Sequence, residues 1–402
     1  MGTENEQLKA KGDQVFIGTY ARYPVAMVKG DGARLYDADG REYLDFLGGI
    51  AVAALGHCHP RVTEAICRQA GELVHVSNLY YTRPQTELAE LLVANTFADK
   101  VFMANSGAEA NEAAMKLARI ASPEGKYGII TLEGSFHGRT LAAVAATGQP
   151  KFHQGFEPMP DGFRHAPFGD LEALEAMIDD TTCAIMCEPI QGESGVRPLD
   201  IEYLQAIRAL CDKHGLLLIF DEVQTGVGRT GSLYAYQQLG VVPDIMTSAK
   251  GLGNGMPIGA MLTTEQLAKK LVPGTHASTF GGNPVACAAA VATLKVMLEE
   301  AFFPAVQANS EHFQAGLAGL VEKYPALVSQ VRGSGMMLGL VLTDQGREQG
   351  TPIVNSLLDK GFIINFAGGT ALRFVPPLTV TRSEIDQLLA ALEATLAEFQ
   401  AA

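Results

Sequence analysis

The chain has 402 residues, of which 47% are hydrophobic and 18% charged, so it has ample apolar material for a core and is not intrinsically disordered. Its 30 lysines and arginines against 44 aspartates and glutamates leave a net charge of −14, which argues against nucleic acid or an acidic membrane as a partner. The six cysteines form no CxxC pair, and this argues against the usual zinc and redox motifs.

The amino-terminal stretch is predicted to be part of a small domain. Its first 14 residues are polar and lack the apolar segment of a signal peptide, and no apolar run in the chain is long enough to span a bilayer. We therefore expect a cytoplasmic protein. Two short apolar runs within residues 15–47, with the turn sequence DADG, indicate a hairpin. His57 and His59 lack a third ligand nearby, so we expect a turn there and no metal site.

From about residue 99 to 248, short apolar runs alternate with helical patterns. The runs are all of strand length: 100–105, 127–132, 183–188, 216–222 and 244–249. The last four are apolar on successive residues, which is typical of strands buried on both faces and so of a mainly parallel sheet covered by helices. The stretches 108–121 and 201–214 carry apolar residues three and four apart, as helices do. The pattern predicts an α/β, doubly wound core within a large domain, residues 48–284.

The rest of the chain is mixed. The predicted elements are a long alanine-rich helix from Pro284 to about Glu300, strands at 336–342 and 371–375, and a final helix from about Arg382. Residues 1–47 and 285–402 are each thin for an independent core. We therefore expect them to form one smaller domain together.

Ligands of open α/β sheets lie at the carboxyl ends of the strands, so the residues that follow each run are the candidates for a site. Ser106, Gly107 and Ala108 follow the first run and open a helix, where free N–H groups suit a phosphate; an ordinary helix cap is the alternative. Phe136 and Arg139 follow the second run between glycines. They suit a planar ring and a carboxylate, or else a core plug beside a solvated cation.

Two charged residues end later runs. Asp221 closes an apolar strand, where a carboxylate is costly to bury unless it is paired. It is either a partner for a protonated ring nitrogen or an ordinary cap or salt bridge. Lys250 closes the next run before a glycine, which suits a lowered pKa and Schiff-base chemistry. A phosphate cradle, a stacking aromatic, an acid and such a lysine together describe pyridoxal phosphate.

A second glycine pattern is set aside. Residues 226–231, GVGRTG, fit the GxGxxG spelling of a dinucleotide site. Five residues separate them from the preceding strand, and no strand ending in an acidic ribose ligand follows about twenty residues on. The fingerprint therefore fails on its context.

Three longer motifs carry a resemblance to a known family. They are LLLIFDEVQTGVGRTG at 216–231, SAKGLGNGMPIGAM at 248–261 and HASTFGGNP at 276–284. The chain resembles the class-III (ornithine/acetylornithine) aminotransferases of fold type I, nearly end to end, and GGIAVAALGHCHP at 48–60 is most similar to their bacterial acetylornithine branch. The resemblance implies a fold type I PLP-transferase with a mainly parallel sheet in the large cofactor domain and a smaller domain from both chain ends.

The resemblance implies a set of residues that bind pyridoxal 5'-phosphate. Lys250 would hold the cofactor and then shuttle a proton, and Asp221 would keep the ring nitrogen protonated. The other cofactor-binding residues would be Ser106, with Gly107 and Ala108 at the phosphate, Phe136 stacked on the ring, Glu222, Val223, Gln224 at the ring hydroxyl, and Thr279 at the phosphate of the neighbouring subunit. Because two chains would then build each site, the resemblance also implies a homodimer.

The resemblance extends to the substrates. Arg139, with Ser278 nearby, would bind the carboxylate of N2-acetyl-L-ornithine, and the loop around Tyr20 would contribute to donor choice. Arg373 would bind the α-carboxylate of glutamate or 2-oxoglutarate. Glu193 would pair with Arg373 whenever the donor carries no carboxylate there, so that one site accepts two differently charged substrates. An ordinary surface ion pair is the alternative.

The implied reaction transfers the δ-amino group of N2-acetyl-L-ornithine to 2-oxoglutarate in arginine biosynthesis. Other donors that fit the same machinery stay open: succinyl-diaminopimelate, succinylornithine, ornithine and 4-aminobutyrate. An intramolecular aminomutase is a further alternative, and it would need no external keto acid. A catalytically dead scaffold is disfavoured because Lys250 is intact.

Overall fold

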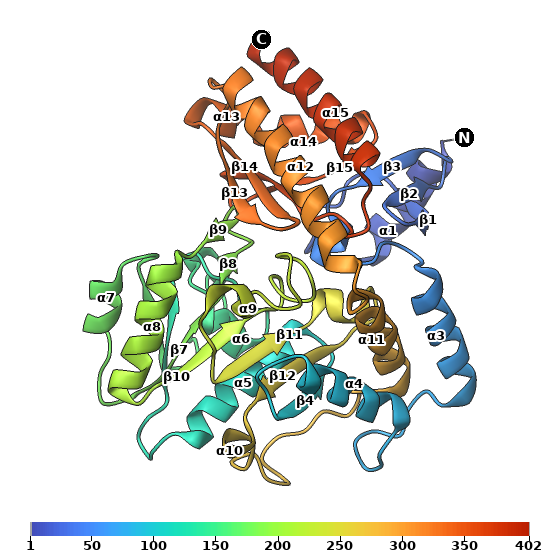
Figure 1. The fold of residues 1–402 in the computed structure, drawn as a ribbon. Helices are drawn as coiled ribbons and strands as arrows, with labels where there is room; N and C mark the ends of the chain where they lie inside the picture. The colour runs from blue at the N-terminus through green and yellow to red at the C-terminus, as the bar shows by residue number, and fades with distance from the viewer. Residues whose placement is uncertain (1, 402) are drawn as a thin grey trace.

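The largest unit of the molecule is a seven-stranded sheet. A computed structural model describes residues 2–401 (Figure 1). In spatial order the strands are β4 (Lys100–Ala104), β12 (Gly259–Thr263), β11 (Ile245–Ser248), β10 (Leu217–Asp221), β7 (Thr182–Cys187), β5 (Gly128–Leu132) and β6 (Phe163–Ala166). Only β12 runs antiparallel to its neighbours in this sheet. The α/β fold with a mainly parallel sheet is therefore confirmed, and the five predicted runs are strands.

Helices cover both faces of this sheet, as the strand residues themselves require. Neighbouring residues such as Ile129 and Ile130, or Ile219 and Phe220, are fully buried and belong to two different hydrophobic cores. The helix α5 (Gly107–Ala121) supplies one core, and α8 (Ile201–His214) the other. Continuous apolar strands are thus explained by apolar surroundings on both sides.

Shorter elements complete this part of the chain. They are α2 (Gly48–Ala51), α3 (Pro60–Glu72), α4 (Arg83–Ala94), α6 (Leu141–Ala146), η1 (Pro150–Phe152), α7 (Leu171–Ala176), β8 (Ile190–Gln191), β9 (Arg197–Pro198), α9 (Tyr236–Leu239), η2 (Lys250–Gly253) and α10 (Glu265–Ala268). The helix α11 (Pro284–Met297), capped by Asn283, is buried on nearly every side because it packs against α3 and α4. It ends before Glu300, the predicted limit.

The two chain ends build the upper part of Figure 1. Its elements are α1 (Glu4–Val15), β1 (Met27–Asp31), β2 (Arg34–Asp37), β3 (Glu42–Asp45), α12 (Phe302–Lys323), β13 (Val328–Ser334), β14 (Met337–Leu342), α13 (Asp344–Glu348), α14 (Gly350–Asp359), β15 (Phe362–Ile363), β16 (Asn365–Ala367), β17 (Ala371–Phe374) and α15 (Arg382–Ala401). The predicted hairpin is present as β2 and β3, with β1 as a third strand. Strand β15 pairs with β3, so the two ends share one sheet. The domain boundaries at 47 and 284 stay predictions.

Within residues 2–401, no helix is both long enough and apolar enough to cross a membrane.

Candidate active site

A cavity of about 400 Å3 lies at the carboxyl ends of the parallel strands. Segments that follow five strands of the large sheet line it, because parallel strands bring their ends to one edge. The structure brings together nine of the predicted site residues on its wall: Ser106, Gly107, Ala108, Phe136, Arg139, Asp221, Val223, Gln224 and Lys250.

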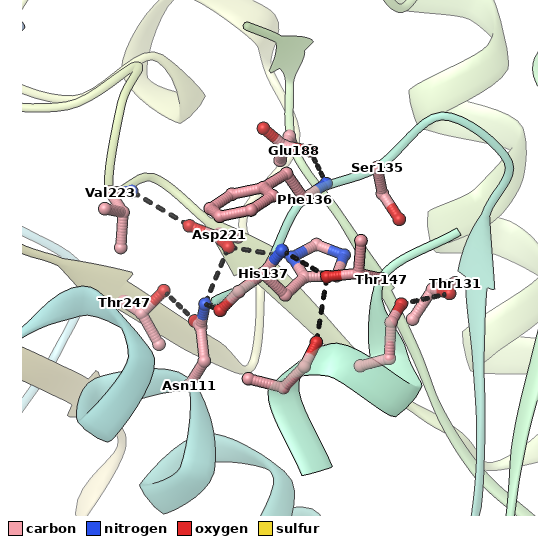
Figure 2. Close-up of polar contacts among 12 residues, drawn as sticks. Asn111, Thr131, Ser135, Phe136, His137, Thr147, Glu188, Asp221, Val223 and Thr247 are labelled. Atoms are coloured by element: carbon pink, nitrogen blue, oxygen red, sulfur yellow. Dashed lines mark hydrogen bonds and ion pairs between the residues drawn. The ribbon is translucent and has the colours of Figure 1, made fainter. Parts of the chain in front are cut away.

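Asp221 is a buried carboxylate with three hydrogen-bond donors (Figure 2). Its Oδ2 accepts from Asn111 Nδ2 and from His137 Nδ1, each at 2.8 Å, and its Oδ1 accepts from the backbone N–H of Val223 at 3.0 Å. Three donors on one carboxylate offset the cost of burying it. The end of β10 therefore holds a carboxyl group in one orientation at the cavity wall.

Asn111 and His137 were not predicted as site residues. Asn111 lies in the middle of α5, and its Oδ1 accepts from the hydroxyl of Thr247 on β11 at 2.7 Å, while its amide also donates to the carbonyl of His137. The backbone N–H of His137 donates to the hydroxyl of Thr147 at 2.9 Å. A polar residue among the alanines of a buried helix was the signal that sequence reasoning missed.

The cavity wall also carries an aromatic ring, that of Phe136. The backbone N–H of Phe136 donates to Glu188 Oε1 at 2.9 Å, which fixes the loop (Figure 2). The guanidinium of Arg139 lies 5.5 Å from the Phe136 ring and 4.1 Å from that of Phe152. Burial, and then the nearby charge of Asp221, raise the pKa of Glu188 well above its usual value.

The start of α5 forms a tight cradle. The hydroxyl of Ser106 caps the helix by accepting from the N–H of Glu109, and Gly107 begins it at the cavity wall. A Cβ added to Gly107 would lie 2.7 Å from the side chain of Val223, so only glycine fits there. Free N–H groups at a helix start suit an anion such as phosphate.

Lys250 stands at the end of β11 with a positive φ of 44°. Within residues 2–401 its amine has no hydrogen-bond or ion-pair partner. Burial lowers its pKa, while the charge of Glu193 acts in the opposite direction. An unpaired amine with a lowered pKa is a nucleophile and a base.

The structure joins Glu193 and Arg373, which are far apart in the sequence. Arg373 Nη1 lies 2.6 Å from Glu193 Oε1, and Arg373 is only 1% exposed. The same nitrogen donates to Gln224 Oε1 at 3.2 Å, and Gln224 Nε2 donates to Glu193 at 3.3 Å. Burial alone would raise the pKa of Glu193, but Arg373 and Lys250 bring it below its usual value. Gln224 thus links this ion pair to the cavity.

Four predicted residues lie elsewhere. The carboxylate of Glu222 accepts from the backbone N–H groups of Ala235 and Tyr236, so it supports α9 and does not line the cavity; burial raises its pKa to about 7. Ser278 accepts from the N–H of Gly281 and lines a neighbouring surface hollow. The side chains of Thr279 and Tyr20 are exposed, and Tyr20 lies beside Arg22 in a separate hollow.

Comparisons with known proteins agree with this geometry. The family model for aminotransferase class-III matches residues 18–396. The chain is 50% identical to the acetylornithine aminotransferase of Caldanaerobacter subterraneus subsp. tengcongensis over 96% of this chain and 98% of that protein.

Two solved structures are also similar. The acetylornithine aminotransferase from Elizabethkingia anophelis has a TM-score of 0.88 at 31% identity, covering 99% of this chain and 100% of that one. An ornithine aminotransferase from Toxoplasma gondii, with partial occupancy of PLP at its active site, has a TM-score of 0.93 at 33% identity, covering 99% of this chain and 95% of that one.

Proposed function

Since the chain belongs to the class-III aminotransferases, we propose that it transfers the δ-amino group of N2-acetyl-L-ornithine to 2-oxoglutarate with pyridoxal 5'-phosphate as cofactor. The products are N-acetyl-L-glutamate 5-semialdehyde and L-glutamate. One observation carries the proposal: a buried, fully hydrogen-bonded Asp221 and an unpaired Lys250 line the same cavity. The 50% identity to an acetylornithine aminotransferase supports the choice of donor.

The residues of the cavity fit the cofactor. The start of α5 would hold its phosphate, since Gly107 leaves no room for a side chain. Phe136 would cover the ring, and Asp221 would keep a proton on the ring nitrogen. When bound, pyridoxal phosphate supplies an electron sink for the carbon that loses a proton.

Lys250 has two tasks in this proposal. Its amine would hold the cofactor covalently before the substrate arrives, and once released it would accept and return the proton at the reacting carbon. Because burial lowers its pKa, the neutral, basic form of the amine is favoured. Asn111 and His137 act behind Asp221 by holding its carboxyl group in one orientation.

The Glu193–Arg373 pair lets one site receive two kinds of substrate. With the acyl-amino donor bound, Glu193 neutralises Arg373 at 2.6 Å. When 2-oxoglutarate enters, its carboxylate replaces Glu193 as the partner of the guanidinium. Arg139, held over two aromatic rings, would bind the carboxylate of the donor.

We also propose that the protein is cytoplasmic and that two copies of the chain together form each active site. Thr279 is exposed. Its segment is held against the loop before α4, because Asn78 in that loop donates to the carbonyls of Ser278 and Gly281, each at 2.9 Å. Beside it, Tyr81 is 99% and Phe280 62% exposed. A cluster of exposed large apolar side chains is typical of an interface, and a second copy would cover it.

The proposed donor is tested by single-turnover absorbance. The yellow holoenzyme is mixed separately with N-acetylornithine, succinyl-diaminopimelate, ornithine and 4-aminobutyrate, without keto acid. We expect fast bleaching with N-acetylornithine alone, and recovery of the colour only when 2-oxoglutarate is added. Bleaching by another amine alone would overturn the donor but keep the chemistry. Turnover without any keto acid would indicate an aminomutase instead.

A further inference from the structure

The GVGRTG loop (residues 226–231), whose context does not fit a dinucleotide site, connects the two parts of the molecule. Arg229 is its central residue and is 2% exposed. Its Nη1 donates to the carbonyls of Met336 at 3.0 Å and Pro376 at 2.5 Å, both in the C-terminal part of the chain. Within residues 2–401, only carbonyl oxygens accept from this guanidinium.

Further contacts fix the same loop against the turn between β13 and β14. The carbonyl of Arg229 accepts from the N–H of Met336 at 2.9 Å, and the hydroxyl of Ser334 donates to the carbonyl of Thr230 at 3.3 Å. Gly335 has a positive φ of 57°, and a Cβ there would lie 2.4 Å from the backbone of Thr230. The loop and the turn therefore touch without space for a side chain between them.

These contacts lie at the end of β17, which carries Arg373, and at the start of β14, which pairs with it. Arg373 is on β17, three residues before Pro376, and it is opposite Gly339 on β14, which begins directly after Met336. On its other side, the GVGRTG loop starts two residues after Gln224, which lines the cavity. Arg229 is thus placed between the cofactor wall and the strands of Arg373.

A buried guanidinium without an anionic partner is costly. Burial lowers the pKa of Arg229 to about 9, with the charge of Asp45 acting against this effect, and Nη2 is buried with no hydrogen-bond partner. An apolar side chain of the same size would fill the space more cheaply. What the arginine adds is a nitrogen, Nη1, that donates to two separate carbonyls.

We propose that Arg229 is a positioning residue for the carboxylate site. By holding the ends of β14 and β17, it keeps Arg373 at the distance from the cavity that a five-carbon dicarboxylate requires. Its loss then weakens recognition of 2-oxoglutarate more than that of the amino donor. The inference rests on the proposed function, because it assigns Arg373 to the keto acid.

The test compares the wild type with Arg229→Met, Arg229→Lys and the control Arg208→Met. Arg208 is a partly buried arginine on α8 that pairs with Asp244. Asp244 directly precedes β11, at the edge of the large sheet away from the cavity. Calorimetry gives the Kd of glutarate, an unreactive dicarboxylate, and single-turnover absorbance gives each half-reaction. For Arg229→Met we expect a Kd about tenfold higher and a 2-oxoglutarate half-reaction about tenfold slower, with the donor half-reaction changed by less than about threefold. Arg229→Lys should recover part of the loss, and Arg208→Met should leave the ratio of the two half-reactions unchanged.

Equal losses in both half-reactions, or an unchanged Kd for glutarate, would overturn the role of Arg229. If Arg229→Met does not fold, Gly335→Ala opens the same contact without removing a buried charge, and it must show the same selective loss. A wild type that uses no 2-oxoglutarate would overturn the proposed function itself, which separates the two failures.

Discussion

At the scale of single residues, the backbone of Lys250 is as informative as its amine. A positive φ costs a lysine about 1–2 kcal/mol, and the surrounding loop must hold it there. The following residue, Gly251, lets the loop pack tightly against its neighbours, because a Cβ on it would lie only 3.2 Å from Ala54 and 3.3 Å from Val227. This strained turn places Lys250 on the cavity wall.

Lys250→Ala should abolish turnover, because an alanine side chain can neither hold the cofactor nor carry the proton. The amine makes no contact that stabilises the fold, so circular dichroism and the Tm should change little. Lys250→Arg, which keeps the charge but does not release a proton near neutral pH, should be equally inactive. Near-normal activity in either variant would contradict the mechanism.

Arg373→Ala and Glu193→Gln should separate the two half-reactions. Removing the arginine takes away the partner of the keto-acid carboxylate and should slow the 2-oxoglutarate half-reaction about 100-fold, a loss of about 2.7 kcal/mol. Glu193→Gln leaves Arg373 buried without an anion and should slow the donor half-reaction more. Single-turnover absorbance measures the rate of each half-reaction. If the ratio of the two rates is the same in both variants, Glu193 and the keto-acid carboxylate do not exchange as partners of Arg373.

At the scale of elements, the sequence predicted those strands whose residues are apolar on both faces. Strand β6 was missed because Arg164 and His165 interrupt its apolar pattern, and β12 because it follows a glycine-rich segment. For the site, strand ends were predictive since topology alone brings them together. Asn111 and Glu188 were not found, because their roles depend on contacts with loops many residues away.

His165 on β6 predicts an acid-sensitive element. Burial, followed by the nearby His153 and His137, lowers its pKa from 6.5 to about 4. Between these two values, the unfolded chain binds a proton at His165 and the folded chain does not. The contribution of His165 to the free energy of unfolding is therefore fully present above pH 6.5 and is lost as the pH falls towards 4. Allowing for partial exposure, the loss is about 2 kcal/mol. In urea unfolding between pH 7 and 5, His165→Asn should lose less stability than the wild type, and equal losses would contradict the assignment.

At the scale of the whole molecule, one group of exposed apolar side chains lies near the segment of Thr279. Leu79 is 81% exposed and Tyr81 99%, and the ring of His75 stacks on Phe280 at 5.1 Å. The net charge of −14 keeps the rest of the surface soluble. The apolar side chains near Thr279 are thus the ones that we expect at the contact between two copies.

The double variant Tyr81→Glu and Phe280→Glu should sediment as a monomer and lose activity, because each copy would no longer lend Thr279 to the other site. Val242→Glu, at an exposed apolar residue of another loop, is the matched control and should stay dimeric and active. Analytical ultracentrifugation over a range of concentrations decides the matter. A fully active monomer would contradict the shared site.

The pairing of β4 with β12 has a consequence for synthesis of the chain. Strand β4 leaves the ribosome first among the strands of the large sheet, but its only partner there follows about 150 residues later, roughly 8–30 s at ordinary translation speed. Until then its edge is open, the condition that recruits chaperones or leads to aggregation. Moreover, Gly259 on β12 lies against the backbone of Ser106, so the proposed phosphate cradle is completed by the last strand of the large sheet to be made. A nascent chain that ends before β12 therefore has an incomplete cradle. The enzyme becomes able to bind its cofactor only after this strand has been translated.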